Sequence, residues 1–156
     1  NKYGGYTEDG DEYQEVVDRL KVKWETARKM VPKPDIQYSK INKIGLIAFG
    51  SSYGASKEAI KKLKKKGLKV NYCRIKSFPF DKSIKSFIDK HEKVFVVEQN
   101  RDAQMRSLLM LDLEIHPSKL FSILHYDGNP IYANIIVKEL LDKESISWSE
   151  ICNELH

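Results

Sequence analysis

The sequence predicts an α/β domain with a mostly parallel sheet, and three observations indicate this fold class. Strand-like segments at residues 44–49, 68–75, 93–97 and 121–124 alternate with segments of helical periodicity. Such alternation is typical of βαβ units, whose strands run parallel and whose crossovers are right-handed. The run at 44–49 is apolar at nearly every position, as expected for a strand buried on both faces. The length of 156 residues fits one domain with its own core.

The first 34 residues are expected to form an arm, a helix and a linker ahead of this domain. Residues 1–11 are rich in Gly, Tyr and acidic side chains, which indicates an extended arm. Residues 12–30 carry apolar side chains at three- and four-residue spacing, which predicts an amphipathic helix. These apolar residues are Val16, Val17, Leu20, Trp24, Ala27 and Met30. Pro32 and Pro34 then end the helix, because proline cannot continue it.

The main domain is predicted at residues 35–142, and its first half contains three strands. A short strand at 35–38 precedes the apolar strand at 44–49. A Gly-Ser turn at 50–54 leads into a helix at 55–66, which Gly67 ends in a left-handed conformation. The next strand, at 68–75, is followed by the loop Lys76-Ser77-Phe78-Pro79-Phe80. Asp81 is expected to cap a helix that runs to His91, with Ile84, Phe87 and Ile88 facing inward.

The second half continues the alternation. A strand at 93–97 leads through Glu98-Gln99-Asn100 into a helix at 103–113, and the last strand is expected at 121–124. A turn-rich segment at 125–130 precedes a helix at 131–141. We expect residues 143–156 to form a separate tail helix, opened by a capping box at Ser147-Trp148-Ser149-Glu150.

The composition excludes several classes of protein. No apolar run is long enough to cross a membrane and no secretory signal is visible. Cys73 and Cys152 are too few for a four-thiolate metal site and offer no disulfide framework, so a cytoplasmic location is expected. The four histidines have no metal-ligand spacing, so no metal site is predicted. The chain begins with Asn1 rather than Met, which is typical of an excised or processed segment.

The carboxyl edge of the sheet is the predicted functional edge, because ligands of parallel sheets bind there. One candidate is an anion-binding loop formed by Gly50, Ser51, Ser52 and Tyr53 ahead of a helix. This segment is not a P-loop or a G-x-G-x-x-G motif. The alternative, which we favour, is a tight turn in which Ser51 or Ser52 caps the first helical amides.

A second candidate is a polar cluster made of Glu98, Gln99 and Asn100 with the segment His125-Tyr126-Asp127. A desolvated Glu98 could act as a general acid or base, but the sequence pairs it with no second carboxylate or nucleophile. We therefore favour an interface or interloop hydrogen-bond cluster. No catalytic residue is predicted.

The net charge of +5 is concentrated in one predicted helix. Its lysines are Lys57, Lys61, Lys62, Lys64, Lys65 and Lys66. A nucleic-acid patch is one interpretation. No aromatic side chains interleave with the lysines as a stacking platform would require, so we favour a solvated helix face and expect no nucleic-acid partner.

Three ordered segments, at residues 47–55, 96–104 and 125–131, resemble the C-terminal part of the α subunit of 2-oxoacid:ferredoxin oxidoreductases, most like the 2-oxoglutarate type. The stretch at 3–9 and the helix after it are also similar to the segment that leads into that domain. The resemblance implies a three-layer α/β/α domain like the C-terminal domain of transketolase, with about five mostly parallel strands. Segment 35–38 would be the one antiparallel strand.

The same resemblance implies a role within a larger enzyme. Enzymes of this family decarboxylate 2-oxoacids such as pyruvate or 2-oxoglutarate on thiamine diphosphate with magnesium. They pass electrons through an iron–sulfur cluster to ferredoxin and transfer the acyl group to coenzyme A. This chain lacks the G-D-G motif and a cysteine cluster. We therefore expect it to bind none of these cofactors, to be inactive alone, and to contact other domains and the β subunit, with ferredoxin only an indirect partner.

A different function class stays open at the level of the sequence. The chain could instead be a free-standing α/β module that holds a nucleotide or phosphate at the loop formed by Gly50, Ser51, Ser52 and Tyr53. Saturable nucleotide binding by the isolated chain would distinguish this module from a domain that only supports assembly.

Overall fold

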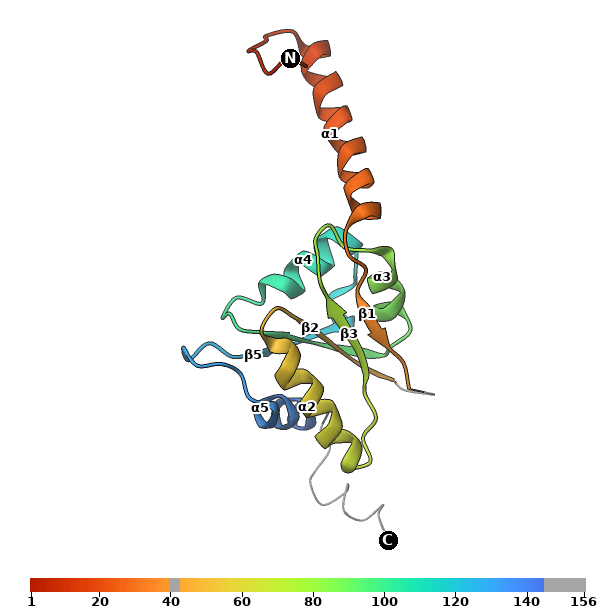
Figure 1. Cartoon of the computed structure of the whole chain (residues 1–156), viewed down its shortest axis with the longest axis vertical. Coiled ribbons are helices and arrows are strands. Elements are labelled where there is room, and N and C mark those ends of the chain that lie inside the picture. Colours follow the sequence, from red (N-terminus) through yellow and green to blue (C-terminus); the bar gives the residue numbers. More distant parts are fainter. Residues whose placement is uncertain (40–42, 145–156) are drawn as a thin grey trace.

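The computed structural model describes residues 1–39 and 43–144, and a five-stranded sheet forms its centre (Figure 1). The strands are β1 (Asp35–Gln37), β2 (Ile44–Phe49), β3 (Asn71–Ile75), β4 (Lys93–Glu98) and β5 (Leu120–Leu124). Their order is β1-β3-β2-β4-β5. Strands β2 to β5 are parallel, whereas β1 pairs antiparallel with β3. Both the predicted parallel sheet and the antiparallel strand expected from the resemblance are confirmed.

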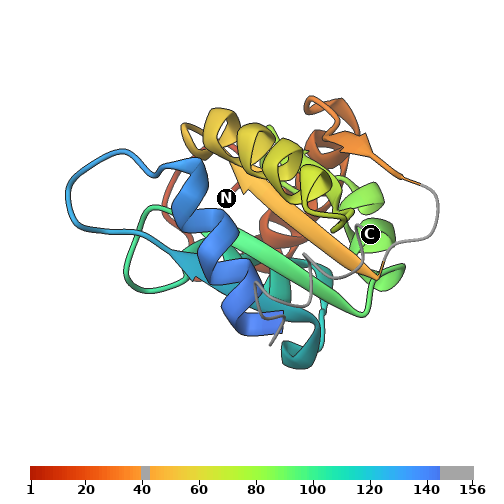
Figure 2. The same ribbon diagram turned by 90° about the horizontal axis from the view of Figure 1, so that it is seen from below.

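Helices cover both faces of the sheet, which makes a three-layer α/β/α domain (Figure 2). Helices α2 (Ser52–Lys65) and α5 (Ala133–Glu144) pack on one face, and α3 (Lys82–Asp89) and α4 (Gln104–Leu113) on the other. Successive side chains of a strand point to opposite faces, so Leu46 joins the core under α2 and α5 while Ile47 joins the other. A short 3-10 helix, η1 (Pro117–Lys119), precedes β5.

Several predicted boundaries in the first half of the domain were wrong. Helix α2 begins at Ser52 rather than residue 55, because the turn after β2 is tight and already helical at its second serine. Strand β3 begins at Asn71 rather than residue 68, since Asn71 is the first residue with a partner, Gly45, on β2. Helix α3 ends at Asp89 instead of reaching His91.

The last described helix also differs from its predicted limits. Helix α5 begins at Ala133 rather than residue 131, and it continues to Glu144 rather than ending at residue 141. An ion pair of 3.1 Å between Lys93 and Glu144 holds its last residue to the start of β4. The predicted capping box at 147–150 lies outside the described residues.

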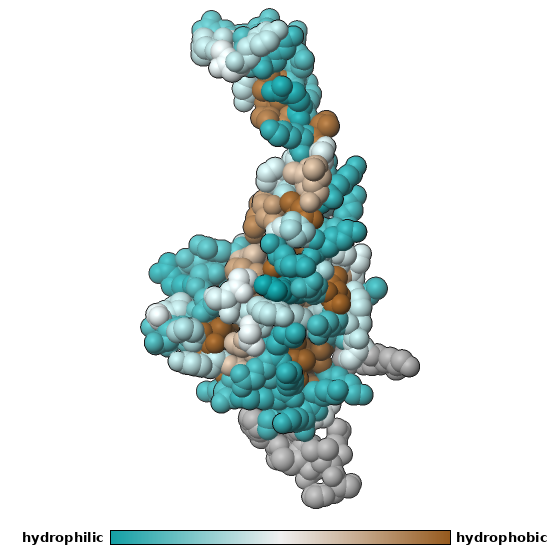
Figure 3. Space-filling view, in the orientation of Figure 1, coloured by the Kyte–Doolittle hydropathy of each residue, from teal (hydrophilic) through white to brown (hydrophobic). Residues whose placement is uncertain are grey.

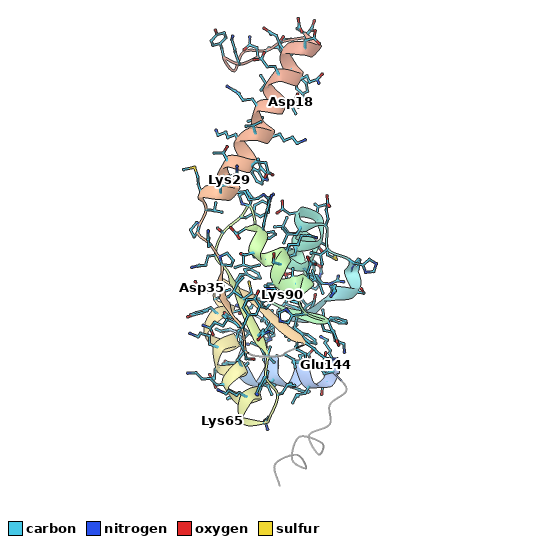
Figure 4. All side chains as sticks on the ribbon, turned by 90° about the vertical axis from the view of Figure 1, so that its right-hand side faces the viewer. Asp18, Lys29, Asp35, Lys65, Lys90 and Glu144 are labelled. Atoms are coloured by element: carbon cyan, nitrogen blue, oxygen red, sulfur yellow. The ribbon has the colours of Figure 1, made fainter. Side chains whose placement is uncertain are left out.

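Helix α1 (Gly10–Met30) extends away from the domain (Figures 1 and 4). It begins two residues earlier than predicted, because the carboxylate of Asp9 accepts hydrogen bonds from the amides of Asp11 and Glu12. In Figure 4, Asp18 lies on the outer part of the helix and Lys29 at its base. None of its residues is buried, so the predicted apolar face does not pack into the core.

Helix α1 touches the domain at its base. The ring of Trp24 meets that of Phe78 edge-on, with centroids 5.4 Å apart. The guanidinium of Arg28 donates to both carboxylate oxygens of Asp112, at 2.8 and 3.0 Å, and to the carbonyl of Phe80 at 2.7 Å. Both charged side chains are largely shielded from solvent, so this forked contact anchors the helix. Neither α1 nor any other helix in the described ranges is apolar and long enough to span a membrane.

Candidate functional site

The carboxyl edge brings the predicted segments together, because β4 lies between β2 and β5 in the sheet. The amide nitrogen of Gln99 donates to Ser51 Oγ at 2.7 Å, and its carbonyl oxygen accepts from the amide of Ile131 at 3.1 Å. Gln99 therefore joins the loop after β2 to the segment that opens α5. These three segments are far apart in the sequence, and one side chain connects them.

Glu98 organises the start of α4 rather than presenting a free carboxylate. Its side chain is fully buried, and it accepts hydrogen bonds from the amides of Met105 at 2.7 Å and Arg106 at 2.9 Å. A third bond comes from the amide group of Asn100, at 2.8 Å. The residue at the helix start, Ala103, has φ 51° and caps nothing with its side chain. Glu98 thus supplies the missing cap from the preceding strand, and its two oxygens are occupied.

Asn100 completes this cluster. Its side-chain oxygen accepts from the amides of Asp102 at 3.1 Å and Gln104 at 3.2 Å, while its nitrogen donates to Glu98. The loop between β4 and α4 is therefore held by side chains that the sequence places one after another. Glu98, Gln99 and Asn100 thus form an interloop hydrogen-bond network, and the carboxylate of Glu98 is used within it.

In the loop formed by Gly50, Ser51, Ser52 and Tyr53, both serine hydroxyls already have hydrogen-bond partners. Ser51 precedes α2 but makes no capping bond with its side chain. The buried Ser52 hydroxyl donates back to the carbonyl of Phe49 at 2.6 Å and accepts from the amide of the same residue at 3.3 Å. The interpretation that either serine caps the helix was wrong, because both hydroxyls are turned toward other partners.

Cationic side chains surround Tyr53, which the sequence analysis did not anticipate. The Arg74 guanidinium lies 3.9 Å from the centre of the Tyr53 ring, and Lys57 Nζ donates to its hydroxyl at 3.3 Å. Asp35 on β1 balances part of this charge, since its carboxylate lies 4.0 Å from Arg74 Nη1. Lys76 Nζ donates to the same carboxylate at 2.7 Å, and this bond lowers the pKa of the Asp35 carboxyl. The available signal was the charged Arg74 within a predicted strand.

The segment after β5 combines a buried histidine with an exposed tyrosine. Nε2 of His125 lies 3.1 Å from a carboxylate oxygen of Asp127. The same oxygen accepts from the amide of Asn129 at 2.8 Å, and this bond lowers the pKa of the Asp127 carboxyl. Tyr126 is 62% exposed, so its side chain is free to contact another surface.

A shallow apolar pocket of about 230 Å³ lies beside this edge. Phe49, Phe78, Met105 and Leu108 are among its lining residues, and Phe78 is itself exposed. No group of three or more His, Cys, Asp or Glu side chains in residues 1–39 and 43–144 is placed to hold a metal ion. Burial raises the pKa of the Cys73 thiol to about 12, so this cysteine is not a thiolate ligand at neutral pH.

The arrangement of strands and layers defines a class of protein, the transketolase C-terminal-like α/β/α domains. A split-gene transketolase, solved as an inactive β4 tetramer, shares the fold with a TM-score of 0.51 and 16% identity, over 76% of this chain and 38% of that one. The family model described as pyruvate:ferredoxin oxidoreductase core domain II matches residues 42–133. This is more than half of the sequence, and the chain belongs to that family.

Similar proteins agree with this assignment. The α subunit of 2-oxoacid:ferredoxin oxidoreductase 2 from Aeropyrum pernix is 25% identical over 138 residues, which cover 85% of this chain and 21% of that subunit. The corresponding α subunit from Saccharolobus solfataricus is 26% identical over 136 residues, 84% of this chain and 21% of that subunit. This chain therefore spans about one fifth of the length of these relatives. The family resemblance read from the sequence is confirmed.

A solved structure of a similar protein has the same fold over most of this chain. The 2-oxoglutarate:ferredoxin oxidoreductase from Magnetococcus marinus, with 2-oxoglutarate, coenzyme A and succinyl-CoA bound, has the same fold, with a TM-score of 0.78 and 21% identity. The match covers 92% of this chain and 25% of that one. The residues from β1 onward make up less than 92% of the chain. The match therefore also includes most of the segment ahead of β1.

Proposed function

We propose that this chain is a non-catalytic domain of the α subunit of a 2-oxoacid:ferredoxin oxidoreductase, with 2-oxoglutarate as the expected substrate. In this role it supports assembly, and its carboxyl edge packs against other domains of the enzyme and its β subunit, with ferredoxin an indirect partner. The enzyme would work in the cytoplasm. The 2-oxoglutarate assignment draws on the sequence resemblance and on the likeness to the Magnetococcus marinus enzyme, which has 2-oxoglutarate bound.

One observation carries the proposal: the polar side chains that follow β2 and β4 at the carboxyl edge are used to build that edge. Glu98 binds two helix amides, Gln99 bridges two loops, and Ser52 binds the preceding strand. A rigid, preorganised surface with an exposed tyrosine suits docking, since little side-chain entropy is lost when it meets a partner. A catalytic edge would instead need an acid or base whose oxygens or nitrogens can reach a substrate.

Two of the family's cofactors, the iron–sulfur cluster and magnesium, do not fit the described residues. An iron–sulfur cluster needs several thiolates, and Cys73 is buried and protonated. Magnesium prefers carboxylate oxygens, but the carboxylates of Glu98 and Asp35 are occupied by amides and by Lys76. We infer that thiamine diphosphate, magnesium, the iron–sulfur cluster and coenzyme A are held by other parts of the enzyme and not by this chain.

The test is reconstitution from parts. The remainder of the α subunit is produced with the β subunit, and 2-oxoglutarate- and coenzyme A-dependent reduction of a viologen dye is measured with and without this chain. We expect no turnover from the chain alone and recovery of activity when it is added. Turnover by the chain alone, or full activity of the remainder without it, would contradict the proposal.

Surface variants localise the docking edge. Phe78→Ser and Tyr126→Ser alter exposed aromatic side chains at the carboxyl edge, whereas Leu111→Ser alters an exposed side chain near the far end of α4. We expect the first two to weaken reconstitution and the third to leave it unchanged. Equal effects of all three would argue against a docking role for this edge.

The alternative is a module that binds a nucleotide or phosphate near Tyr53, and the cations Lys57 and Arg74 are the observation in its favour. Calorimetry of the chain with nucleotides and coenzyme A tests it. Saturable binding that Arg74→Gln abolishes would support this module, while the occupied Ser52 hydroxyl and the nearby Asp35 lead us to expect none.

A further inference from the structure

Helix α1 carries an apolar row that the domain does not bury. Tyr13, Val17, Leu20 and Trp24 follow one another at spacings of four, three and four residues. This is the heptad spacing by which a helix packs along another helix. We call these four residues the α1 seam. Each of them is between 44% and 66% exposed, and the brown patches along the projecting helix in Figure 3 show apolar surface in contact with solvent.

The exposed seam is a consequence of where α1 is anchored. Trp24 and Arg28, near its last turns, hold the helix to the domain. The outer part of the helix points away from the sheet and the helices that cover it, as Figures 1 and 4 show. Most helical stability in proteins comes from packing an apolar face against another surface rather than from intrinsic propensity. We therefore expect the α1 seam to be buried against another surface.

The charges of α1 indicate which partner fits. From residue 8 to residue 18 the charged side chains are all acidic: Glu8, Asp9, Asp11, Glu12, Glu15 and Asp18. From residue 19 to residue 29 they are all basic except Glu25: Arg19, Lys21, Lys23, Arg28 and Lys29. The helix is thus acidic in its outer half and basic near the domain. A parallel neighbour of the same sequence would place like charges side by side, whereas an antiparallel neighbour would place each acidic half beside a basic half.

We propose that α1 is a self-complementary dimerisation element, which pairs antiparallel with α1 of a second copy of this chain. The seam matches itself in this orientation. Val17 lies opposite Leu20 of the second copy, and Tyr13 lies opposite Trp24 of the second copy. The contact is isologous, so each pair occurs twice across one two-fold axis. Because the domains stand at opposite ends of the paired helices, they do not collide.

The proposed helix–helix contact also includes the domain surface at the base of α1. Phe78 is exposed and already touches Trp24, so Tyr13 of the second copy completes a three-ring aromatic cluster there. The arm that precedes α1 in the second copy would then lie against this base. The arm carries the exposed Tyr3 and Tyr6, which add apolar area.

The first test measures the oligomeric state of the whole chain by sedimentation equilibrium between about 5 and 200 µM. We expect a concentration-dependent dimer that Leu20→Glu weakens at least about tenfold. Val22→Glu is the matched control, because Val22 is also apolar and exposed on the same helix but lies off the seam. Since α1 has no buried residue, both variants should keep the unfolding midpoint of the domain.

The second test measures orientation by disulfide cross-linking in a Cys152→Ser background. A mixture of Val17→Cys and Leu20→Cys chains should cross-link faster than Val17→Cys chains alone, because residues 17 and 20 face each other only in the antiparallel pair. A chain that stays monomeric, a dimer that Val22→Glu dissociates as readily as Leu20→Glu, or faster cross-linking of Val17→Cys alone would each overturn the proposal.

Discussion

Replacing Glu98 by glutamine tests whether this buried carboxylate holds the carboxyl edge together. Glutamine keeps the length of the side chain and one acceptor oxygen. Its amide nitrogen, however, can only donate, and it must face either Arg106 N on one side or Met105 N and Asn100 Nδ2 on the other. At least one buried donor therefore loses its acceptor and faces another donor.

The expected loss follows from those contacts. A hydrogen bond to a charged group contributes about 1.5–3 kcal/mol, and a buried donor left without an acceptor costs about 1–3 kcal/mol. The start of α4 also loses the negative charge that its aligned amides favour, which is worth up to about 1 kcal/mol. We expect Glu98→Gln to lower the free energy of unfolding by about 2–4 kcal/mol.

The assay is urea unfolding of the whole chain, together with amide hydrogen exchange at Met105 and Arg106. Exchange at these two amides should accelerate more than in the central strand β2, because their acceptor is the group that changes. Glu58→Gln is the control. Its carboxylate is exposed and pairs with Lys62 within one helix, so the loss should stay below about 0.5 kcal/mol. The reasoning would be refuted if both variants lost the same stability, or if Glu98→Gln lost none.

Three further predictions concern the anchor of α1, a buried histidine and a helix cap. Arg28→Lys keeps the charge but not the forked bond to Asp112, so urea unfolding should show a loss of about 1–2 kcal/mol; an unchanged midpoint would contradict the anchor. Burial lowers the pKa of His91, so the unfolded chain takes up a proton first, and stability should fall as pH drops from about 7.5 toward about 5.5. The dependence should weaken in His91→Gln, and an equal slope in both proteins would exclude His91 as its source. Asp81→Ala removes the bond to the Ser83 amide and should cost about 1 kcal/mol, whereas Asp81→Asn should retain most of the stability; equal losses would argue against capping.

Local chemistry made much of the fold predictable. The apolar strands at 44–49 and 93–97 were found because a strand covered on both faces must be apolar at nearly every position. Asp81 and Gly67 marked helix ends correctly, since a capping carboxylate and a left-handed glycine act on backbone groups only a few residues away. The antiparallel direction of β1, in contrast, came from the family resemblance, because three residues carry too little pattern to define it.

The predicted edge cluster shows that hydrogen-bond partners distant in the chain cannot be predicted from local sequence. Glu98, Gln99 and Asn100 were recognisable as a polar group at a strand end. Their roles depended on partners such as Ser51 and Ile131, which only the order of the strands brings within hydrogen-bond distance. The cations around Tyr53 were missed for the same reason, since Arg74 reaches that ring from a neighbouring strand.

By itself, the sequence determined the alternation of elements, the parallel character of the sheet, the helix ends marked by Asp81 and Gly67, and the family, because these depend on periodicity and on neighbours along the chain. Only the tertiary structure decided that Glu98 is buried as a cap and that the apolar row of α1 stands in solvent. The physical reason is that burial and hydrogen-bond partners are set by residues distant in the chain. An apolar helix face indicates that another surface should cover it. Only the tertiary structure shows whether that surface belongs to the same domain.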